Sequence, residues 1–378
     1  MDFELDEDHL ILQQSIREFA TKEVAKGAAE RDEKAEMPDS LIKQLAELGL
    51  FGIAIPEQYG GAGMGTIASS IVVEEISKAC AATGVLISAH ASLCVEPIMT
   101  FGTDAQKEKY LPGLASGETI GCLSLTEPGS GSDAGAATCR AELKDDGWHI
   151  TGTKNFVTNG KQAGVVVLIA VTDPDEPKRR LSAFIVEKQA PGFRVGKLES
   201  KLGIRCSSTA EFAFEDCVVP HDALLGERGR GLRIALTTLD AGRIGIAAQA
   251  LGIAEACLYE ATNYAKTRVQ FGRPIGRFQA IQNKLADMAV GIEAARALTY
   301  RAAWYKDMGK EYGQFAAMGK LYASEVSSMA ANHAIQVFGG YGYCSDYPVE
   351  RYLRDAKITE LYEGTSEIHR LVIARSLA

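Results

Sequence analysis

The stretch that decides the fold is LDAGRIGIAAQALGIAEACLYEATNYAKTR, residues 239–268, which runs for about thirty residues without proline. A second stretch of the same texture, FQAIQNKLADMAVGIEAARALTYRAAWYKDMG, occupies residues 278–309. A third, residues 315–338, carries small residues such as Ala316, Ala323 and Ala330. Long antiparallel helices that pack closely through alanine form bundles. The sequence therefore predicts a four-helix bundle domain over residues 229–378.

The texture changes in residues 121–228, where short β-branched and aromatic runs alternate with Gly, Pro and Asp clusters. The runs are GCLSLTEP (121–128), WHITGTKNFVTNG (148–160), GVVVLIAVT (164–172), LSAFIVEK (181–188) and AEFAFEDCVVP (210–220). This pattern is typical of an antiparallel barrel or sandwich. No helix of useful length separates the runs, which disfavours a doubly wound parallel sheet.

Residues 1–120 return to helical spacing, as in Leu12, Ile16 and Phe19. The apolar stretch 67–94 predicts one long buried helix, and residues 101–118 predict two short ones, the second opened by Pro112. The predicted fold class is therefore α+β, mostly α. It has three domains: an N-terminal helical domain (1–120), a central β domain (121–228) and the bundle (229–378).

Composition excludes several classes of protein. The chain has 378 residues, a net charge of −9 and a pI near 5.4, which argues against a nucleic-acid binder. We find no run of ~18 apolar residues, so no membrane span is predicted. The acidic N-terminus lacks the basic region of a signal peptide, and the eight cysteines form no CxxC pair. These features predict a cytoplasmic protein with reduced thiols and no metal site.

The common catalytic signatures are missing from the sequence. No GxGxxG follows a strand and opens a helix, so a nicotinamide-binding Rossmann site has no support. GWHITGTK (147–154) superficially resembles a phosphate loop, but its Thr and Lys are in the wrong order and it lies in a predicted strand. No GxSxG supplies a nucleophile for acyl hydrolysis.

Three segments remain that can carry chemistry, and each has a plain structural alternative. LTEPGSGSD (125–133) is either a loop whose backbone N–H groups approach an anion or a β-turn. RVQFGRPIGRFQ (268–279) is either a phosphate-binding break between helices or a solvated cap. LYEGTSE (361–367) places Glu363 beside Gly364, and a single carboxylate is more often a surface residue than a catalyst.

Together with three further strings, these segments resemble the acyl-CoA dehydrogenases. TEPGSGSD, FVTNG, LDAGRIGIAAQALGIA, RVQFGRPIGRFQ, QVFGGYGY and LYEGTSEI occur in the order of that family and span essentially the whole chain. The likeness is greatest to the short-chain, butyryl-CoA branch. The resemblance implies FAD held between the β domain and the bundle, and a homotetramer built as a dimer of dimers. It also implies an acyl-CoA substrate and electron-transfer flavoprotein as the electron acceptor.

The resemblance also assigns tasks to individual residues. The implied cofactor-binding positions are Leu125, Thr126, Ser132, Phe156, Thr158, Arg268, Phe271, Phe278, Gln279, Gln336, Phe338, Gly339, Gly340, Thr365 and Glu367. The implied substrate-binding positions are Ser132, Asp240, Arg243 and Gly364. The segments at Arg268 and Gln336 are expected to serve the cofactor of a neighbouring subunit. Two positions depart from the common pattern, since many members have tryptophan in place of Phe156 and glutamine in place of Glu367.

The resemblance makes Glu363 the catalytic base. The α-hydrogen of a saturated thioester is a very weak acid, so a base removes it only while the thioester carbonyl is polarised. Some members carry the base on the bundle near the position of Gly242, and glycine cannot serve. The predicted reaction is α,β-dehydrogenation of a short-chain acyl-CoA to the trans-2-enoyl-CoA. The alternatives are a branched, cyclic or aromatic-pathway substrate, an enoyl-CoA reductase or bifurcating relative, and a non-catalytic interaction module.

Overall fold

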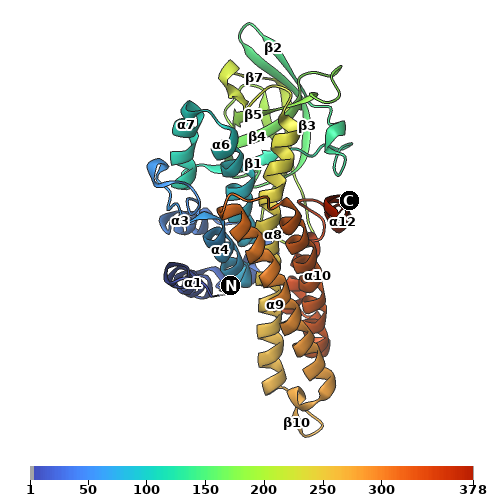
Figure 1. The fold of residues 1–378 in the computed structure, drawn as a ribbon. Coiled ribbons are helices and arrows are strands. Elements are labelled where there is room, and N and C mark those ends of the chain that lie inside the picture. The colour runs from blue at the N-terminus through green and yellow to red at the C-terminus, as the bar shows by residue number, and fades with distance from the viewer. Residues whose placement is uncertain (1–3, 378) are drawn as a thin grey trace.

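The computed structural model describes residues 4–377, and its three zones follow one another along the chain (Figure 1). The first zone holds α1 (Glu7–Phe19), η1 (Ala20–Val24), α2 (Ala28–Lys34), α3 (Asp39–Glu47), η2 (Glu57–Tyr59), α4 (Gly65–Ala79), α5 (Ala81–Ala89), η3 (His90–Val95), α6 (Glu96–Phe101) and α7 (Asp104–Ala115). The second holds β1 (Ile120–Ser124), η4 (Ala134–Ala136), β2 (Arg140–Lys144), β3 (Gly147–Thr158), β4 (Ala163–Val171), β5 (Leu181–Glu187), β6 (Phe193–Leu198), β7 (Thr209–Val219), η5 (His221–Ala223) and β8 (Leu224–Leu225). The third holds α8 (Gly231–Thr267), β9 (Val269–Gln270), β10 (Arg273–Pro274), η6 (Ile275–Arg277), α9 (Gln279–Asp307), α10 (Gly313–Phe338), η7 (Gly339–Tyr343), α11 (Val349–Ile358) and α12 (Ser366–Leu377).

The N-terminal helices differ from the prediction at two places. The expected helix over residues 67–94 is broken at Cys80, whose extended backbone separates α4 from α5, and it continues into the π-helical turn η3. Pro112 lies inside α7 and does not open a second helix. A proline in the last turn costs only one backbone hydrogen bond, and the capping box of Thr103 and Gln106 stabilises the other end of α7.

The central strands form one eight-stranded sheet in the order β6-β7-β3-β2-β4-β5-β8, with β1 added on β4. Most neighbours are antiparallel, as predicted, but β1 and β2 both run parallel to β4. Side chains of β4 alternate between two cores. Val165, Val167 and Ile169 face the helices, whereas Val166 and Leu168 pack with residues of β3, β5 and β7. The sheet therefore curves around a core of its own and covers the helices with its other face.

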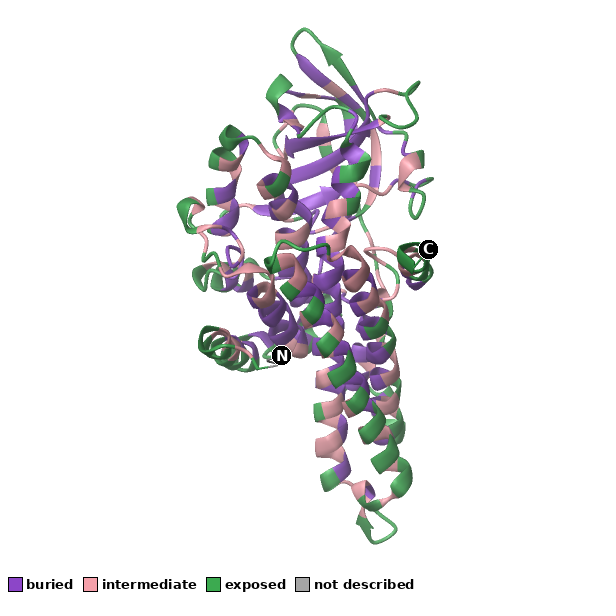
Figure 2. Cartoon of the chain, in the orientation of Figure 1, coloured by how far each residue is buried: buried purple, intermediate pink, exposed green. Residues whose placement is uncertain are grey.

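Three long helices, α8, α9 and α10, lie side by side and extend away from the sheet (Figure 1). Their contacts are made by small buried residues, among them Ala247, Ala295 and Ala330, which allow close approach. The C-terminal α11 and α12 are short and pack on α10, whereas α4 from the first zone packs on α8 and α9. Figure 2 shows burial concentrated where these helices meet, and exposure at the hairpin beyond α8.

Two helical segments are long and apolar enough to cross a membrane by length and composition alone. They are Ala81–Phe101 and Gly231–Thr267. In the tested windows 67% and 72% of the residues are buried inside the protein. Such burial is what core helices of a folded domain show, and one or two candidates of this kind are weak support for a membrane span.

Candidate active site

The centre of the candidate site is the loop between α11 and α12, which carries Glu363. Glu363 has a φ of 54° and Gly364 a φ of 94°, so two consecutive residues adopt left-handed backbone conformations. A non-glycine residue seldom adopts this conformation without compensation, and such residues cluster at functional sites. The backbone at Glu363 is therefore held in place by its surroundings.

Several groups hold this loop against the long helices. The Nε of Arg243 on α8 donates to the carbonyl of Glu363 at 3.5 Å, and the Nζ of Lys320 on α10 donates to the carbonyl of Gly364 at 2.7 Å. Next to them, the hydroxyl of Tyr362 donates to the amide oxygen of Gln249 on α8. Both carbonyls of the left-handed pair are thus bound by cationic side chains from two different helices.

The Oε2 atom of Glu363 is buried and has no hydrogen-bond partner among the residues that the structure describes. Burial raises the pKa of Glu363 to about 7, although the charges of Lys320 and Arg243 act in the opposite direction. A Cβ atom at Gly242 would lie 2.6 Å from Oε2, so the glycine on α8 makes room for this carboxyl group. The geometry gives a carboxyl group that titrates near neutral pH, as a candidate general base requires.

The predicted substrate contacts Asp240 and Arg243 form an ion pair on α8 beside this loop. Arg243 is buried, and the structure places it against the backbone of Glu363. Asp240 is partly exposed, and burial raises the pKa of its carboxyl group. Ser132 is exposed on the loop after β1 of the β domain.

The glycine-rich loop after β1 is fixed by a buried ion pair that sequence reasoning missed. Lys154 on β3 is fully buried and donates to the carbonyl of Leu125 at 2.9 Å and to Glu127 at 2.7 Å. Glu127 in turn accepts from the backbone N–H of Thr138 at 2.6 Å and of Cys139 at 3.0 Å. The sequence held a signal for this ion pair, because Glu127 directly follows the predicted contacts Leu125 and Thr126.

Strand β3, which supplies Lys154, also carries the predicted cofactor contacts Phe156 and Thr158 at its end. The pairing of β3 with β7 shifts register between Lys154 and Val157, and Phe156 inside that bulge has a φ of 57°. Its ring is 62% exposed although it belongs to a strand with buried neighbours. Thr158 is the last residue of β3. The loop after β1 is joined to the same strand, because the N–H of Asn155 donates to the carbonyl of Thr126 at 2.8 Å.

A second group of predicted residues lies at the far end of the bundle. Arg268, Phe338, Gly339 and Gly340 line a pocket of about 420 Å³ together with Tyr264 and other residues. Arg268 lies 5.5 Å from the centre of the Tyr341 ring, and Phe338 stacks on Tyr264 at 4.1 Å. The pocket thus offers a guanidinium group, aromatic side chains and two glycines whose absent Cβ atoms would meet nothing within 4 Å.

The remaining predicted cofactor contacts divide between these regions. Phe271 is 93% exposed in the hairpin after α8, with Phe278 at 6.0 Å between ring centres. Gln279 and Gln336 are exposed at the same end of the bundle, on α9 and α10. At the other end, Thr365 accepts from the N–H of Ile368 at 3.4 Å at the start of α12, and Glu367 is exposed in its first turn.

The two groups are not brought together within one chain. Arg243 lies on α8 and Arg268 directly follows its last residue, 25 residues later, which is roughly 38 Å along a helix. Figure 1 shows the hairpin at the end of the bundle remote from the sheet. Glu363 and the β-domain loops therefore lie at one end of the bundle, and the Arg268 pocket lies at the other.

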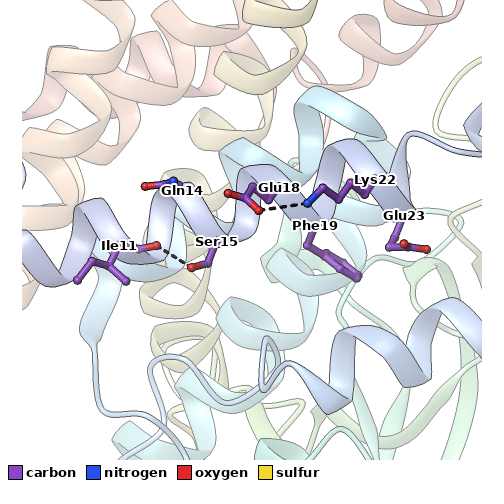
Figure 3. Close-up of a pocket in the computed structure, with 7 residues that line it drawn as sticks. All are labelled: Ile11, Gln14, Ser15, Glu18, Phe19, Lys22 and Glu23. Atoms are coloured by element: carbon purple, nitrogen blue, oxygen red, sulfur yellow. Dashed lines mark hydrogen bonds and ion pairs between the residues drawn. The ribbon is translucent and has the colours of Figure 1, made fainter.

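Another hollow contains none of the predicted residues. It has a volume of about 470 Å³ and is lined by side chains of α1 and η1, among them Ile11, Phe19 and Lys22 (Figure 3). Lys22 pairs with Glu18 at 3.2 Å, and Ser15 donates to the carbonyl of Ile11 at 2.9 Å. These polar side chains bond to other residues of α1 and η1, so we assign no functional site to this hollow.

Comparison with known proteins places these observations in a family. Three family models match: the N-terminal domain of acyl-CoA dehydrogenase over residues 6–118, the middle domain over 122–217 and the C-terminal domain over 229–378. The chain is 50% identical over 374 residues to the short-chain-specific acyl-CoA dehydrogenase of Clostridium acetobutylicum, covering 99% of both chains.

Two solved structures are also similar along the full length. Butyryl-CoA dehydrogenase from Megasphaera elsdenii matches with a TM-score of 0.98 and 45% identity, covering 100% of both chains. A chain from work on the electron-transferring flavoprotein of Acidaminococcus fermentans and flavin-based electron bifurcation matches with a TM-score of 0.99 and 50% identity. That match covers 100% of this chain and 99% of the other. The chain belongs to the acyl-CoA dehydrogenase family.

Proposed function

We propose that this protein is an FAD-dependent dehydrogenase that converts short-chain acyl-CoA thioesters to trans-2-enoyl-CoA, with Glu363 as the base. The observation that carries the proposal is the Glu363 carboxyl group. Its buried Oε2 has no hydrogen-bond partner in the described part of the chain, and its left-handed loop is held by two cationic side chains. Full-length similarity to short-chain and butyryl-CoA dehydrogenases supports the substrate class. FAD dependence is a property of the family.

The residues of this chain fit FAD. Two aromatic rings, Phe156 and Phe271, stand exposed on left-handed backbones, a costly arrangement unless a flat ligand covers them. The backbone at Gly339 and Gly340 is open beside Arg268, as a phosphate or adenosine group requires. Leu125, Thr126 and Thr158 would hold the ring end, and Arg268 and Phe271 the pyrophosphate and adenine end.

In this account the chain positions and polarises the substrate. Glu363 takes the α-proton on its carboxylate, and its raised pKa makes it a stronger base than a solvated glutamate. Among the described residues the N–H of Glu363 makes no backbone hydrogen bond, so it can donate to the thioester carbonyl. FAD supplies the acceptor for the hydride that leaves the β-carbon. Asp240, Ser132 and the Gly364 backbone are assigned to the coenzyme A and thioester portions.

We also propose that two copies complete each cofactor site. Within one chain, the loop that carries Glu363 (residues 359–365, called the catalytic loop) and the Arg268 pocket are separated by roughly 38 Å along α8, which is more than the length of an FAD molecule. One FAD bound by both groups therefore needs Arg268, Phe271, Gln336 and the neighbouring glycines from a second copy. A homotetramer built as a dimer of dimers satisfies this requirement.

Electron-transfer flavoprotein is the proposed electron acceptor, supported by the matching chain from work on such a flavoprotein. A cytoplasmic location is also a proposal. It rests on the eight cysteines, all free in the described chain and seven of them buried, which fit a reducing compartment. The proposed domain boundaries remain 1–120, 121–228 and 229–378.

The test is product analysis with a panel of thioesters. The purified yellow protein is incubated with butyryl-CoA and an artificial electron acceptor, and the product is expected to be two mass units lighter and to co-elute with trans-2-butenoyl-CoA. Longer, branched, cyclic and dicarboxylic thioesters are expected to turn over more slowly. Faster turnover of one of them reassigns the substrate. Activity only in the reverse direction favours an enoyl-CoA reductase, and a colourless protein that does not bind FAD contradicts the enzyme proposal.

A further inference from the structure

Lys320 is a buried cation next to the catalytic loop for which neither the sequence motifs nor the proposed mechanism gives a role. It lies on α10, is completely inaccessible to solvent, and uses its Nζ to bind the carbonyl of Gly364 at 2.7 Å. A lysine is seldom fully buried unless its charge is balanced. The carboxyl group that balances it electrostatically is that of Glu363.

The surroundings of Gly364 leave the loop little freedom. The ring of His369 on α12 lies against this glycine, since a Cβ there would be 3.1 Å from its Cε1. Within residues 4–377, both buried ring nitrogens of His369 lack hydrogen-bond partners, and burial lowers the pKa of this histidine to about 3. A neutral histidine contributes packing and no charge, so Lys320 is the cationic donor on this side of the loop.

We propose that Lys320 is a positioning residue for the base: its ammonium group holds the Gly364 carbonyl so that Glu363 and Gly364 keep their left-handed conformations, and its charge favours the carboxylate form of Glu363. The inference rests on the proposed role of Glu363. Arg243 acts in the same way on the preceding carbonyl from α8, which explains why two helices are needed to fix one loop.

The charged and titratable groups around Lys320 and Glu363 come from four elements. They are Asp240 and Arg243 on α8, Lys320 on α10, Glu360 and Tyr362 in the loop after α11, and Glu367 and His369 on α12. Of these, Lys320 and Arg243 lower the pKa of Glu363. Burial acts on both members of the pair, because it lowers the pKa of Lys320 to about 7 and raises that of Glu363 to about 7.

Two variants separate the two parts of the proposal. Lys320→Met removes both the charge and the donor, whereas Lys320→Gln removes the charge but keeps an N–H donor for the Gly364 carbonyl. Ser324→Ala is the matched control: Ser324 is buried one turn further along α10, and its hydroxyl bonds only to the carbonyl of Leu321 in its own helix. FAD content and thermal unfolding are measured for all three proteins.

The decisive readout is the midpoint pH at which Glu363 ionises. It is measured from flavin reduction by butyryl-CoA as a function of pH and, independently of turnover, from the infrared carboxyl band that disappears in Glu363→Gln. We expect the midpoint to rise by about one pH unit in both Lys320 variants, because an adjacent opposite charge has been removed. We expect the limiting rate to fall by about ten- to a hundredfold in Lys320→Met, and less in Lys320→Gln.

Each outcome decides one point. An unchanged midpoint in Lys320→Gln, in a protein that binds FAD and melts like the Ser324→Ala control, overturns the charge effect. An unchanged limiting rate in Lys320→Met overturns the positioning effect. If the wild-type protein is not reduced by any thioester, the proposed function fails, and the infrared titration still tests the effect of Lys320 on Glu363. If Lys320→Met does not fold, Lys320→Gln carries the test.

Discussion

Each end of the bundle has two consecutive residues with left-handed backbone conformations, but one pair lies in a packed loop and the other in an exposed hairpin. At one end Glu363 and Gly364 have φ values of 54° and 94°, and at the other Phe271 and Gly272 have values of 52° and 75°. The Glu363 carboxyl group is buried, and its loop is bound by Arg243 and Lys320. Phe271, in contrast, is 93% exposed.

The difference teaches which part of the site one chain completes by itself. At the catalytic loop, packing and hydrogen bonds from α8, α10 and α12 offset the cost of the left-handed residues. At the hairpin, Phe271 has the same strained backbone conformation, but its side chain faces solvent. We interpret the first loop as preorganised by its own chain and the second as completed by a cofactor and a second copy.

The largest expected effect follows from removing the base. Glu363→Gln keeps the size of the side chain but cannot accept the α-proton, so the rate of flavin reduction by butyryl-CoA should fall by about a thousandfold or more. FAD content should be unchanged. Stopped-flow absorbance measures the rate, and reduction within about tenfold of wild type is incompatible with the assigned role.

The second expected effect is loss of cofactor at the remote end. Arg268→Ala removes the guanidinium group of the pocket, so FAD should separate from the protein on gel filtration. Lys266→Ala is the control, because Lys266 is exposed two residues earlier and does not line the pocket. Full FAD occupancy in Arg268→Ala counts against the shared site, as does a protein that runs as a monomer with FAD bound.

The third prediction concerns pH. The pKa of Glu363 is raised to about 7, and the base acts in its deprotonated form. The rate of flavin reduction should therefore be half-maximal near pH 7, level off about one pH unit above it and fall about tenfold for each pH unit well below it. Measurement of the rate between pH 5 and 9 tests this, and an acid limb centred near the ordinary glutamate value of about 4.3 contradicts it.

The smallest effect comes from a matched pair of glycine substitutions. Gly364→Ala adds backbone strain and a Cβ 3.1 Å from the ring of His369, whereas Gly272→Ala adds strain alone, with no atom within 4 Å. We expect a loss of about 1–2 kcal/mol in the free energy of unfolding for Gly272→Ala and more for Gly364→Ala. Denaturant unfolding measures both, and equal losses mean that the catalytic loop is no more tightly packed than the hairpin.

The sequence predicted the three-zone order and the long helices well, because their signals are local. The third long helix was expected at residues 315–338 and occupies Gly313–Phe338. Breaks that depend on tertiary packing were missed. The extended residue Cys80 between α4 and α5 has no proline or glycine to announce it, and Pro112 lies inside a helix that tolerates it.

Only those site residues that lie within a recognisable sequence motif could be predicted. Glu363 and Gly364 were named from LYEGTSE, whereas Lys320 and His369 were not, since each lies within an ordinary helical pattern. Their importance comes from contacts between segments 44 and 5 residues apart, respectively, and only the folded chain shows these contacts. The same holds for Lys154, which was passed over as part of a strand. It donates a hydrogen bond to the carbonyl of Leu125 and forms a buried ion pair with Glu127.

The most direct test of the central claim is an anaerobic titration of the purified protein with butyryl-CoA while the visible spectrum is recorded. The account predicts that the protein is yellow and that its flavin absorbance is bleached as the thioester is added. A yellow protein that no saturated acyl-CoA bleaches contradicts the dehydrogenase assignment. A colourless protein that cannot be reconstituted with FAD contradicts the cofactor site itself.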